Sequence, residues 1–287
     1  MKNILNIIKE KYGFSNIQMG ETIQQKGGRI VSTFVSNEKK YILKIADKSK
    51  IKKDIDHDTF IFPFLKEKGF ITIPRLIKTK SQKRYLEIDG KFVYVLEYIN
   101  GENPKNTIEN WSVLGELMAQ LHHIEDYPYK TSFTFQNEKP TLLKIAKDIA
   151  FKKEYLELVD SLPNFDDFPQ SLIHSDVGLH NSIKTDSGSI ILIDWDGSGM
   201  GTRILDLGFP LICQFVTSDL IFEKEKATAF YNSYLKNNSI TEKERKILFE
   251  ASLFFALMYL PYGNIAENWE KIQFAVKNRV LMSQVLN

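Results

Sequence analysis

The segment from Leu172 to Gly208 holds the side chains whose types and spacing could carry out a reaction. It reads LIHSDVGLHNSIKTDSGSIILIDWDGSGMGTRILDLG. Two strand-like runs inside it flank the turn Thr185–Gly188, so the pattern predicts a β-hairpin. Pairing across this hairpin would bring Asn181 close to Asp194, beside the loop that carries Asp176.

Two carboxylates and an amide that converge in this way offer hard oxygen ligands. Mg²⁺ prefers such ligands, and it is often held by a few protein oxygens together with substrate phosphates. Phosphoryl transfer needs this ion, and it also needs a carboxylate that orients the attacking hydroxyl group and accepts its proton. We therefore expect Asp176 to act as the base, and Asn181 and Asp194 to bind the metal.

The ordered motifs HSDVGLHN, IDWDGSG and LDLG together resemble the catalytic signature of the aminoglycoside phosphotransferase family. These are protein-kinase-like small-molecule kinases related to choline kinases. The resemblance implies that Asp176 is the catalytic base and that Asn181 and Asp194 hold metal. It also implies that His174 and Asp206 brace the catalytic loop.

Other residues of this segment have more open roles. Asp196 could touch a second metal ion or its waters, or it could hydrogen-bond to the glycine-containing loop at 197–201. Ser175 stands where relatives often have glycine. We expect His180 to be a solvated loop residue, and His122, further upstream, to pack or cap rather than to catalyse.

Lys44 lies in the alternating run YILKI, after the turn Gly27-Gly28 and a first strand. A lysine on a strand is commonly a solvated edge residue, but this order resembles the position of the family's nucleotide-binding lysine. The segment 24–32 would then cover the phosphates of ATP or GTP. Because it has few glycines, backbone amides or the Ser32 hydroxyl would make those contacts.

The acidic partner of this lysine is predicted on the following helix. Asp58 occupies the position where relatives show glutamate, with Asp54 and Asp56 nearby. The alternative is that these aspartates form an exposed first turn favoured by the helix dipole. The stretch VYVLEYINGENP resembles the strand and linker beside adenine, where the backbones of Glu97 and Ile99 would bind the base.

The pattern of the chain changes near residue 100. Before it, strand-like runs surround one helix, expected from about Asp54 to Lys68; after it, long helical patterns dominate, with a capping box at Thr241 and Glu244. We predict an α+β, bilobal, protein-kinase-like fold. Its lobes are an N-terminal nucleotide-binding sheet lobe (1–100) and a helical catalytic and substrate-binding lobe (101–287). The predicted strands are 30–35, 40–45, 85–88 and 92–98.

Composition narrows the class of partner. The 38 basic and 36 acidic residues nearly cancel, so no field of one sign favours nucleic acid or an anionic membrane. The longest apolar run, Leu253–Leu260, is well short of the ~20 residues of a membrane span. Cys213 is the single cysteine and cannot form an internal disulfide. We expect a cytoplasmic monomer or weak dimer that binds a small molecule.

The expected activity is Mg²⁺-dependent transfer of the γ-phosphoryl group of ATP or GTP to a hydroxyl of an aminoglycoside-like or other amine-bearing antibiotic, as in antibiotic resistance. The alternatives are a metabolite kinase, acting on choline or ethanolamine, homoserine or a sugar, and a nucleotide-binding pseudokinase. Retention of four residues argues against the pseudokinase, namely Lys44, Asp176, Asn181 and Asp194.

The prediction of a cationic acceptor rests on the charged side chains that follow Asp176, which include few arginines and several carboxylates. Only Arg203, Arg245 and Arg279 follow Asp176, and we expect Arg203 to brace the loop beside Asp206. Arginine is the side chain expected where an anion must be clamped. If several downstream carboxylates face the cleft, a cation is favoured; otherwise a neutral acceptor is open. These candidates are Asp166, Asp167, Glu223, Glu225, Glu267 and Glu270.

Overall fold

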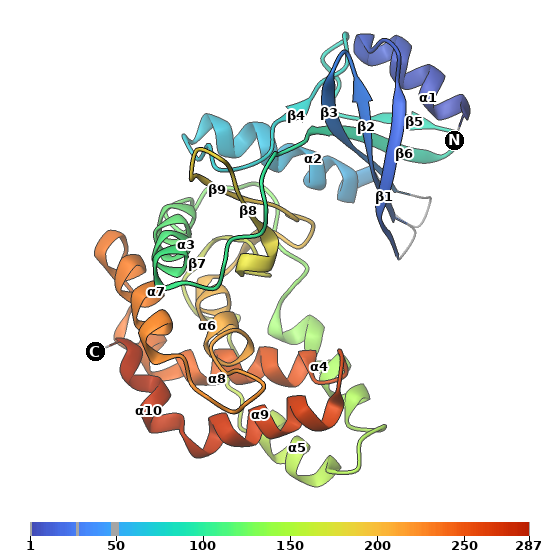
Figure 1. Ribbon diagram of the computed structural model, residues 1–287. Helices are drawn as coiled ribbons and strands as arrows, with labels where there is room; N and C mark the ends of the chain where they lie inside the picture. The colour runs from blue at the N-terminus through green and yellow to red at the C-terminus, as the bar shows by residue number, and fades with distance from the viewer. Residues whose placement is uncertain (1, 27–28, 47–51, 287) are drawn as a thin grey trace. The chain divides into compact units, whose positions relative to one another are not determined.

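The structure is a computed structural model that describes residues 2–26, 29–46 and 52–286. The chain forms two compact units, each with its own secondary structure (Figure 1). The first unit comprises Met1–Glu102 and Ile183–Trp195, and the second comprises Asn103–Ser182 and Asp196–Asn287. The predicted division at residue 100 differs from this one, because it leaves residues 183–195 in the second part.

Backbone hydrogen bonds explain why the hairpin groups with the first unit. Its strands are β8 (Ser182–Lys184) and β9 (Ile190–Leu192). The Leu192 N–H donates to the Thr72 carbonyl at 2.8 Å, and Glu102 and Lys184 exchange backbone bonds of 3.2 and 2.8 Å. Pairing along the chain predicts the hairpin itself but gives no information on these partners.

An antiparallel sheet forms the body of the first unit. Its strands run in the order β1-β2-β3-β6-β4, with β5 paired to β6. They are β1 (Gln18–Lys26), β2 (Arg29–Ser36), β3 (Lys39–Ala46), β4 (Leu76–Ile77), β5 (Leu86–Ile88) and β6 (Lys91–Glu97). The predicted strands did not include β1, because its sequence QMGETIQQK is polar and lacks an apolar alternation.

The alternation of β3 decides where Lys44 lies. Leu43 and Ile45 join the core cluster on one face of the sheet, together with residues of α1 (Lys2–Ile8). Successive residues of a strand point to opposite faces. Lys44 therefore shares its face with Ala46, which packs against Ile55 of α2 (Lys52–Glu67).

Helices dominate the second unit, which also contains the antiparallel strands β7 (Gln170–Ile173) and β10 (Gly199–Thr202). In the first unit a short helical turn at 9–13 follows α1. The helices of the second unit are α3 (Ile108–Leu121), α4 (Phe135–Ile145), α5 (Lys152–Asp160), α6 (Arg203–Cys213), α7 (Lys224–Asn237), α8 (Glu242–Tyr259), α9 (Ile265–Lys277) and α10 (Arg279–Ser283), with short helical turns at 179–181 and 284–286. Together with the first unit, they confirm the predicted α+β class.

Close packing of α6 on α8 builds the centre of this unit. A Cβ atom on Gly208 would lie 2.6 Å from the Cβ of Ala251, so only glycine allows this approach. The apolar run Leu253–Leu260 is mostly buried in and just after α8, as expected of a core helix. None of the helices in the described part of the chain is both long and apolar enough to span a membrane.

The start of α8 is fixed by the predicted capping box. The Thr241 N–H donates to Glu244 at 2.7 Å, and the Glu244 N–H donates to the Thr241 hydroxyl at 3.2 Å. Arg203 also binds Glu244, with Nε 2.8 Å and Nη2 3.0 Å from its two oxygens. Arg203 thus anchors α6 to α8, whereas we expected it to brace the loop beside Asp206.

The Glu244 contact predicts an acid-sensitive stability. Burial acts to raise the pKa of Glu244, but the bonds from Arg203 and Thr241 outweigh it and hold the pKa below its ordinary value of 4.5. Its contribution is therefore fully present above that value and is lost as pH falls through the lower, folded-state pKa. We expect Glu244→Gln to lower the free energy of unfolding at pH 7 by about 3 kcal/mol, because it leaves Arg203 without its charge partner.

Urea titrations over a pH series measure this difference. The difference in free energy of unfolding between wild type and Glu244→Gln should shrink in acid, because Glu244 of the wild type then becomes protonated as well. Glu242→Gln is the matched control, because Glu242 lies on the same first turn and its contact with Lys246 is exposed on both sides. Equal free energies of unfolding of Glu244→Gln and Glu242→Gln at pH 7 would show that the contact between Glu244 and Arg203 does not stabilise the fold.

Candidate active site

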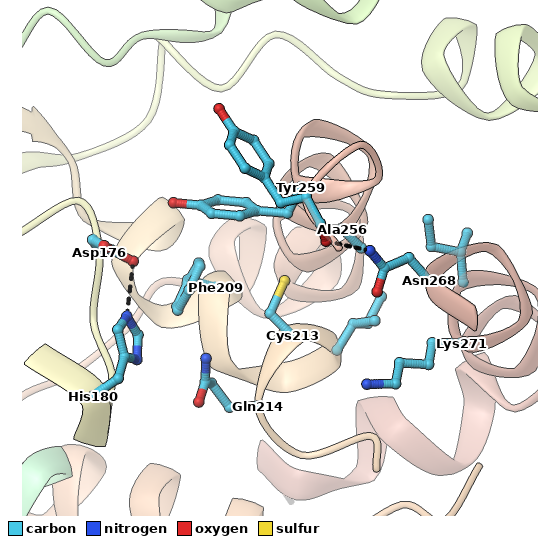
Figure 2. Close-up of a pocket in the computed structure, with 12 residues that line it drawn as sticks. Asp176, His180, Phe209, Cys213, Gln214, Ala256, Tyr259, Asn268 and Lys271 are labelled. Carbon is cyan, nitrogen blue, oxygen red and sulfur yellow. Dashed lines mark hydrogen bonds and ion pairs between the residues drawn. The ribbon is translucent and has the colours of Figure 1, made fainter. Parts of the chain in front are cut away.

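Asp176 lies in the loop after β7, and its carboxylate is held from two sides. Asn181 Nδ2 donates to Asp176 Oδ2 at 2.8 Å and to the Asp176 backbone carbonyl at 2.9 Å. His180 Nε2 lies 3.4 Å from Oδ1, although we expected His180 to be merely solvated (Figure 2). The Asp176 side chain is still 36% exposed, so a substrate can reach it.

These contacts keep Asp176 ionised. Burial acts to raise its pKa, but the hydrogen bonds from His180 and Asn181 and the charge of His180 outweigh burial, so the pKa lies below the ordinary aspartate value. At neutral pH the group is thus a carboxylate with a fixed orientation. Such a group can accept a hydrogen bond, and then a proton, from a hydroxyl beside it.

A buried carboxylate fixes the backbone that precedes Asp176. Asp206 of α6 accepts the N–H groups of His174 and Ser175, both at 2.7 Å. Ser175 has φ +70°, the left-handed region that favours glycine, so the two bonds hold a backbone that this residue seldom adopts. This conformation gives a physical reason to expect glycine at this position.

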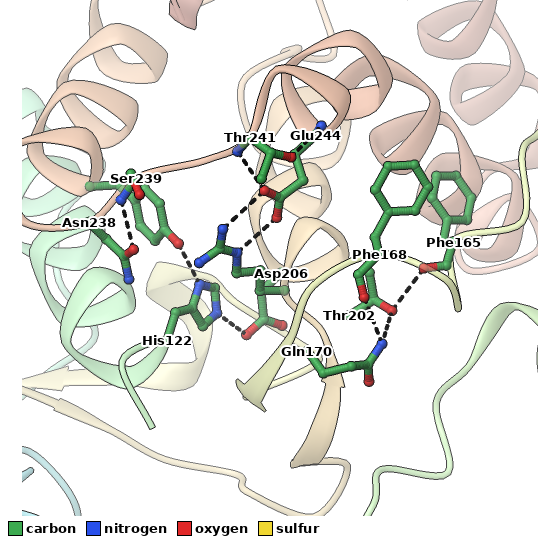
Figure 3. Close-up of polar contacts among 12 residues, drawn as sticks. His122, Phe165, Phe168, Gln170, Thr202, Asp206, Asn238, Ser239, Thr241 and Glu244 are labelled. Carbon is green, nitrogen blue, oxygen red and sulfur yellow. Dashed lines mark hydrogen bonds and ion pairs between the residues drawn. The ribbon is translucent and has the colours of Figure 1, made fainter. Parts of the chain in front are cut away.

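His122 completes the support of Asp206. Its Nε2 lies 3.2 Å from Asp206 Oδ2, and its Nδ1 lies 3.0 Å from the Tyr234 hydroxyl (Figure 3). All three side chains are buried. Tertiary contact thus links α3, α6 and α7 behind the loop, a role that the sequence pattern LHHI did not indicate.

The predicted metal ligands have suitable atoms. Both hydrogen bonds of Asn181 use Nδ2, so its Oδ1 is the atom left for a cation. Asp194 is 47% exposed, has φ +61° and belongs to the first unit, whereas Asn181 belongs to the second. One amide oxygen and one carboxylate fit Mg²⁺ that also binds phosphates.

The Asn181 amide and the Asp194 carboxylate do not form a preformed metal cluster of several protein ligands. Within residues 2–26, 29–46 and 52–286, no group of three His, Cys, Asp or Glu side chains gathers as a metal site. A magnesium ion that arrives with a nucleotide needs only one or two protein oxygens, because phosphates and water supply the rest. The shared use of one ion by Asn181 and Asp194 stays a prediction.

Lys44 lies on the interior strand β3, between β2 and β6, and is not an edge residue. Its side chain is 14% exposed, and its Nζ is 3.8 Å from Asp194 Oδ1. Asp58 is buried and accepts a bond from Arg29 at 3.2 Å, while Asp56 accepts bonds from Arg84 and Tyr85. A Lys44–Asp58 pair therefore stays a prediction, as does a nucleotide-contact role for Asp58.

Other predicted nucleotide contacts are placed as follows. Ser32 is buried, with its hydroxyl 3.1 Å from that of Thr22, so a phosphate contact would compete with this partner. The Glu97 N–H donates to the Arg75 carbonyl at 2.8 Å, so the Glu97 backbone can offer adenine only its carbonyl. Ile99 follows as half-buried linker. The turn Gly27-Gly28 lies outside the described residues.

Asp196 begins the part of the second unit that follows the hairpin. It is half-buried, and the loop after it is tied to the segment before α4, because the Thr131 hydroxyl donates to the Gly197 carbonyl at 2.7 Å. Gly197 also packs closely on Ser175: a Cβ atom there would meet the Ser175 hydroxyl. These contacts do not choose between the metal and the structural role of Asp196.

A pocket of about 420 Å³ adjoins Asp176 within the second unit (Figure 2). Its walls are largely apolar and come from α6, α8 and α9. Tyr259 is one of them, and burial, followed by the charge of Asp176, raises the pKa of its hydroxyl, which stays protonated and able to donate. The apolar and aromatic lining residues are Phe209, Ile212, Ala256, Tyr259, Tyr262 and Ile272.

The downstream carboxylates expected to attract a cation lie elsewhere. Asp166 accepts the N–H groups of Phe135 and Gln136 at the start of α4. Glu223 pairs with Lys226, and Glu267 accepts a bond from Asn264. Among the described residues that line the pocket, Asp176 is the carboxylate, and none of the six candidates joins it.

Comparison with known proteins decides the family. Residues 26–244 match the family described as the phosphotransferase enzyme family, and this match covers more than half of the chain. The chain belongs to the phosphotransferase enzyme family. The predicted membership is confirmed, and with it the class of small-molecule kinases that phosphorylate hydroxyl groups.

Solved structures show which fold this phosphotransferase has. A microcompartment-associated aminopropanol kinase is similar with a TM-score of 0.68 and 18% identity, over 100% of this chain and 99% of that one. An amicoumacin kinase is similar with a TM-score of 0.71 and 15% identity, over 99% of this chain and 93% of that one. A choline kinase from Cryptosporidium parvum is similar with a TM-score of 0.67 and 14% identity, over 99% of this chain and 97% of that one. At these identities the likeness confirms the predicted protein-kinase-like fold.

Lys271 is a charged residue of this pocket that the sequence did not suggest. It lines the pocket from α9, together with Asn268 and Ile272 at helical spacing. A lysine on a helix rich in charge normally indicates a solvated face. The packing of α9 on α6, which the sequence does not reveal, turns this face toward Asp176.

The geometry around Asp206 yields a prediction for the phosphotransferase. We expect Asp206→Asn to lower the free energy of unfolding by about 1–3 kcal/mol, because one oxygen that accepts a backbone N–H is replaced by a second donor. Turnover should fall as well, because the backbone before Asp176 is no longer fixed. Urea titration and steady-state kinetics measure the two effects.

Asp219→Asn provides the comparison, since Asp219 is exposed and lies in a turn after α6. It should match wild type in both measurements. Wild-type stability and turnover in Asp206→Asn would show that the loop does not depend on this carboxylate.

Proposed function

We propose that this phosphotransferase uses Mg²⁺ to transfer the γ-phosphoryl group of ATP or GTP to a hydroxyl group of a small molecule bound in the pocket beside Asp176. The observation that carries the proposal is the position of Asp176. It is an ionised and partly exposed carboxylate, and it lines a pocket of substrate size.

In the proposed mechanism, Asp176 accepts a hydrogen bond from the acceptor hydroxyl and takes its proton as the oxygen attacks the γ-phosphorus. The bond from this phosphorus to the β–γ bridging oxygen breaks, and ADP or GDP leaves. Asn181 holds the carboxylate in place, and Asp206 fixes the backbone behind it. The ion, when bound through Asn181 Oδ1 and Asp194, would neutralise charge on the phosphate oxygens. Lys44, whose Nζ lies 3.8 Å from Asp194 Oδ1, would contact the nucleotide phosphates.

Two kinds of acceptor were expected, and the pocket favours one of them. Similar structures include kinases named for aminopropanol and for choline, which supports a small metabolite as the acceptor. An aminoglycoside, however, carries several ammonium groups, and the described lining offers them only Asp176 as a counter-charge. We therefore favour a metabolite kinase over an antibiotic kinase.

The setting of the reaction is also proposed. We place the enzyme in the cytoplasm as a monomer or weak dimer that binds neither nucleic acid nor membrane. Its near-balanced charge and single cysteine support this setting. A pseudokinase is disfavoured, because Lys44, Asp176 and Asp194 are all present.

The role of Asp176 can be tested by one substitution. Asp176→Asn keeps the size of the side chain but cannot take up the proton, so kcat should fall by about 100-fold or more while nucleotide affinity changes little. Coupled assays of ADP formation and calorimetric titration of nucleotide measure the two quantities. Asp219→Asn serves again as the control. Loss of nucleotide binding instead would make Asp176 a structural residue.

The metal prediction needs two measurements. Excess chelator should abolish turnover, and added Mg²⁺ or Mn²⁺ should restore it. Asp194→Ala should remove activity and weaken binding of the metal–nucleotide complex together, because the carboxylate is proposed to join the ion to the protein. Asp186→Asn, in the exposed turn of the same hairpin, should do neither. Equal activity in excess chelator would refute the metal assignment.

A further inference from the structure

Lys271 places a positive charge in a pocket whose walls are largely apolar. The side chain is half-buried and extends from α9 with its ammonium group directed toward Gln214 (Figure 2). The Cys213 thiol lies close enough for that charge to act on it. Burial and the charge of Asp176 raise the pKa of Cys213 to about 12, and the charge of Lys271 opposes them.

Among the described residues, this ammonium group has no counter-charge of its own. In the part of the chain that the structure describes, Lys271 forms neither an ion pair nor a hydrogen bond. The three downstream arginines are all engaged: Arg203 with Glu244, Arg245 with the Leu286 carbonyl and Arg279 with Glu250. A partly desolvated charge is costly unless something pairs with it.

Two amide side chains line the pocket together with Lys271. Asn268 Nδ2 donates to the carbonyls of Leu260 at 3.2 Å and Tyr262 at 2.8 Å, which fixes this side chain (Figure 2). The Gln214 side chain is half-buried and makes no hydrogen bond among the described residues. One ammonium group and one unused amide donor therefore face the same space.

We propose that Lys271 and Gln214 recognise a carboxylate on the acceptor, so that the substrate is a hydroxy acid with an apolar body. The hydroxyl would lie at Asp176 and the carboxylate at Lys271. This proposal rests on the kinase function proposed above and specifies its acceptor. It makes Lys271 the residue that determines specificity.

The single positive charge of Lys271 favours a carboxylate on the acceptor over a phosphate, an amine or a neutral group. A single ammonium group matches a monoanion, whereas a phosphate carries nearly two charges and is typically clamped by arginine or several donors. An amine-bearing group at the same place would meet a like charge, which is unfavourable. A neutral group would leave the ammonium without a partner.

The experiment compares matched acceptors of equal length. Each set contains an ω-hydroxy acid, its primary amide and the corresponding amino alcohol, in straight-chain and ring-bearing forms. ADP formation gives kcat/KM for each compound, and calorimetry on the enzyme gives its affinity. We expect the acid to exceed the amide by about 10-fold or more in kcat/KM, since hydrogen bonds to charged groups are the stronger class.

Substitutions assign that preference to Lys271. Lys271→Met keeps an apolar stem without the charge, so the acid-to-amide ratio should fall toward one, mainly through KM. Lys271→Glu should reverse the order and favour the amino alcohol. Lys271→Arg should retain the preference for the acid. Lys277→Met is the control on the same helix, because Lys277 is exposed and does not line the pocket.

The outcomes separate this proposal from the kinase function. Turnover of amines or amides at least as good as that of acids, or an acid-to-amide ratio that Lys271→Met leaves unchanged, would overturn the carboxylate site and leave the kinase standing. Acids that bind wild type but not Lys271→Met, with no acceptor phosphorylated, would support the carboxylate site and count against the kinase. Absence of both binding and turnover for every acid would overturn the carboxylate site.

Discussion

Asp206 lies in α6 with its side chain fully buried, and both of its oxygens accept backbone N–H groups from the residues that precede Asp176. The buried carboxyl group needs these donors, because a buried polar group without hydrogen bonds is costly. The loop needs the carboxylate in turn, because Ser175 adopts a left-handed conformation there. His122 links this pair to the rest of the helical unit, so the position of the proposed base depends on the packing of several helices.

Charge is distributed in the pocket so that its two ends differ. Asp176 is negative, Lys271 is positive, and apolar side chains such as Phe209 and Ile272 line the space with them. Such a pocket discriminates by charge placement rather than by total charge, since a compound with its charges reversed would meet repulsion at both ends. The proposed chemistry depends on Asp176, and the proposed selectivity depends on the helices that follow it.

Local patterns in the sequence predicted much of the fold. The Thr241–Glu244 capping box, the hairpin after Asn181 and the buried run in α8 depend on neighbours along the chain, and the structure contains all three. The motifs around Asp176 predicted the family because they too depend on the order and spacing of residues along the chain. Prediction was poorer for β1, whose polar sequence gives no alternation, and for Arg203, whose partner Glu244 is 41 residues away.

The sequence by itself determined which residues can do chemistry, because the side-chain types of Asp176, Asn181 and Asp194 and their spacing are properties of the chain. Only the tertiary structure decided which charges line the pocket beside Asp176. The downstream carboxylates cap helices or face solvent, and Lys271, on a helix that looks solvated, lines the pocket. A helix carries residues on every side, and the face that becomes buried depends on packing against segments distant in the sequence.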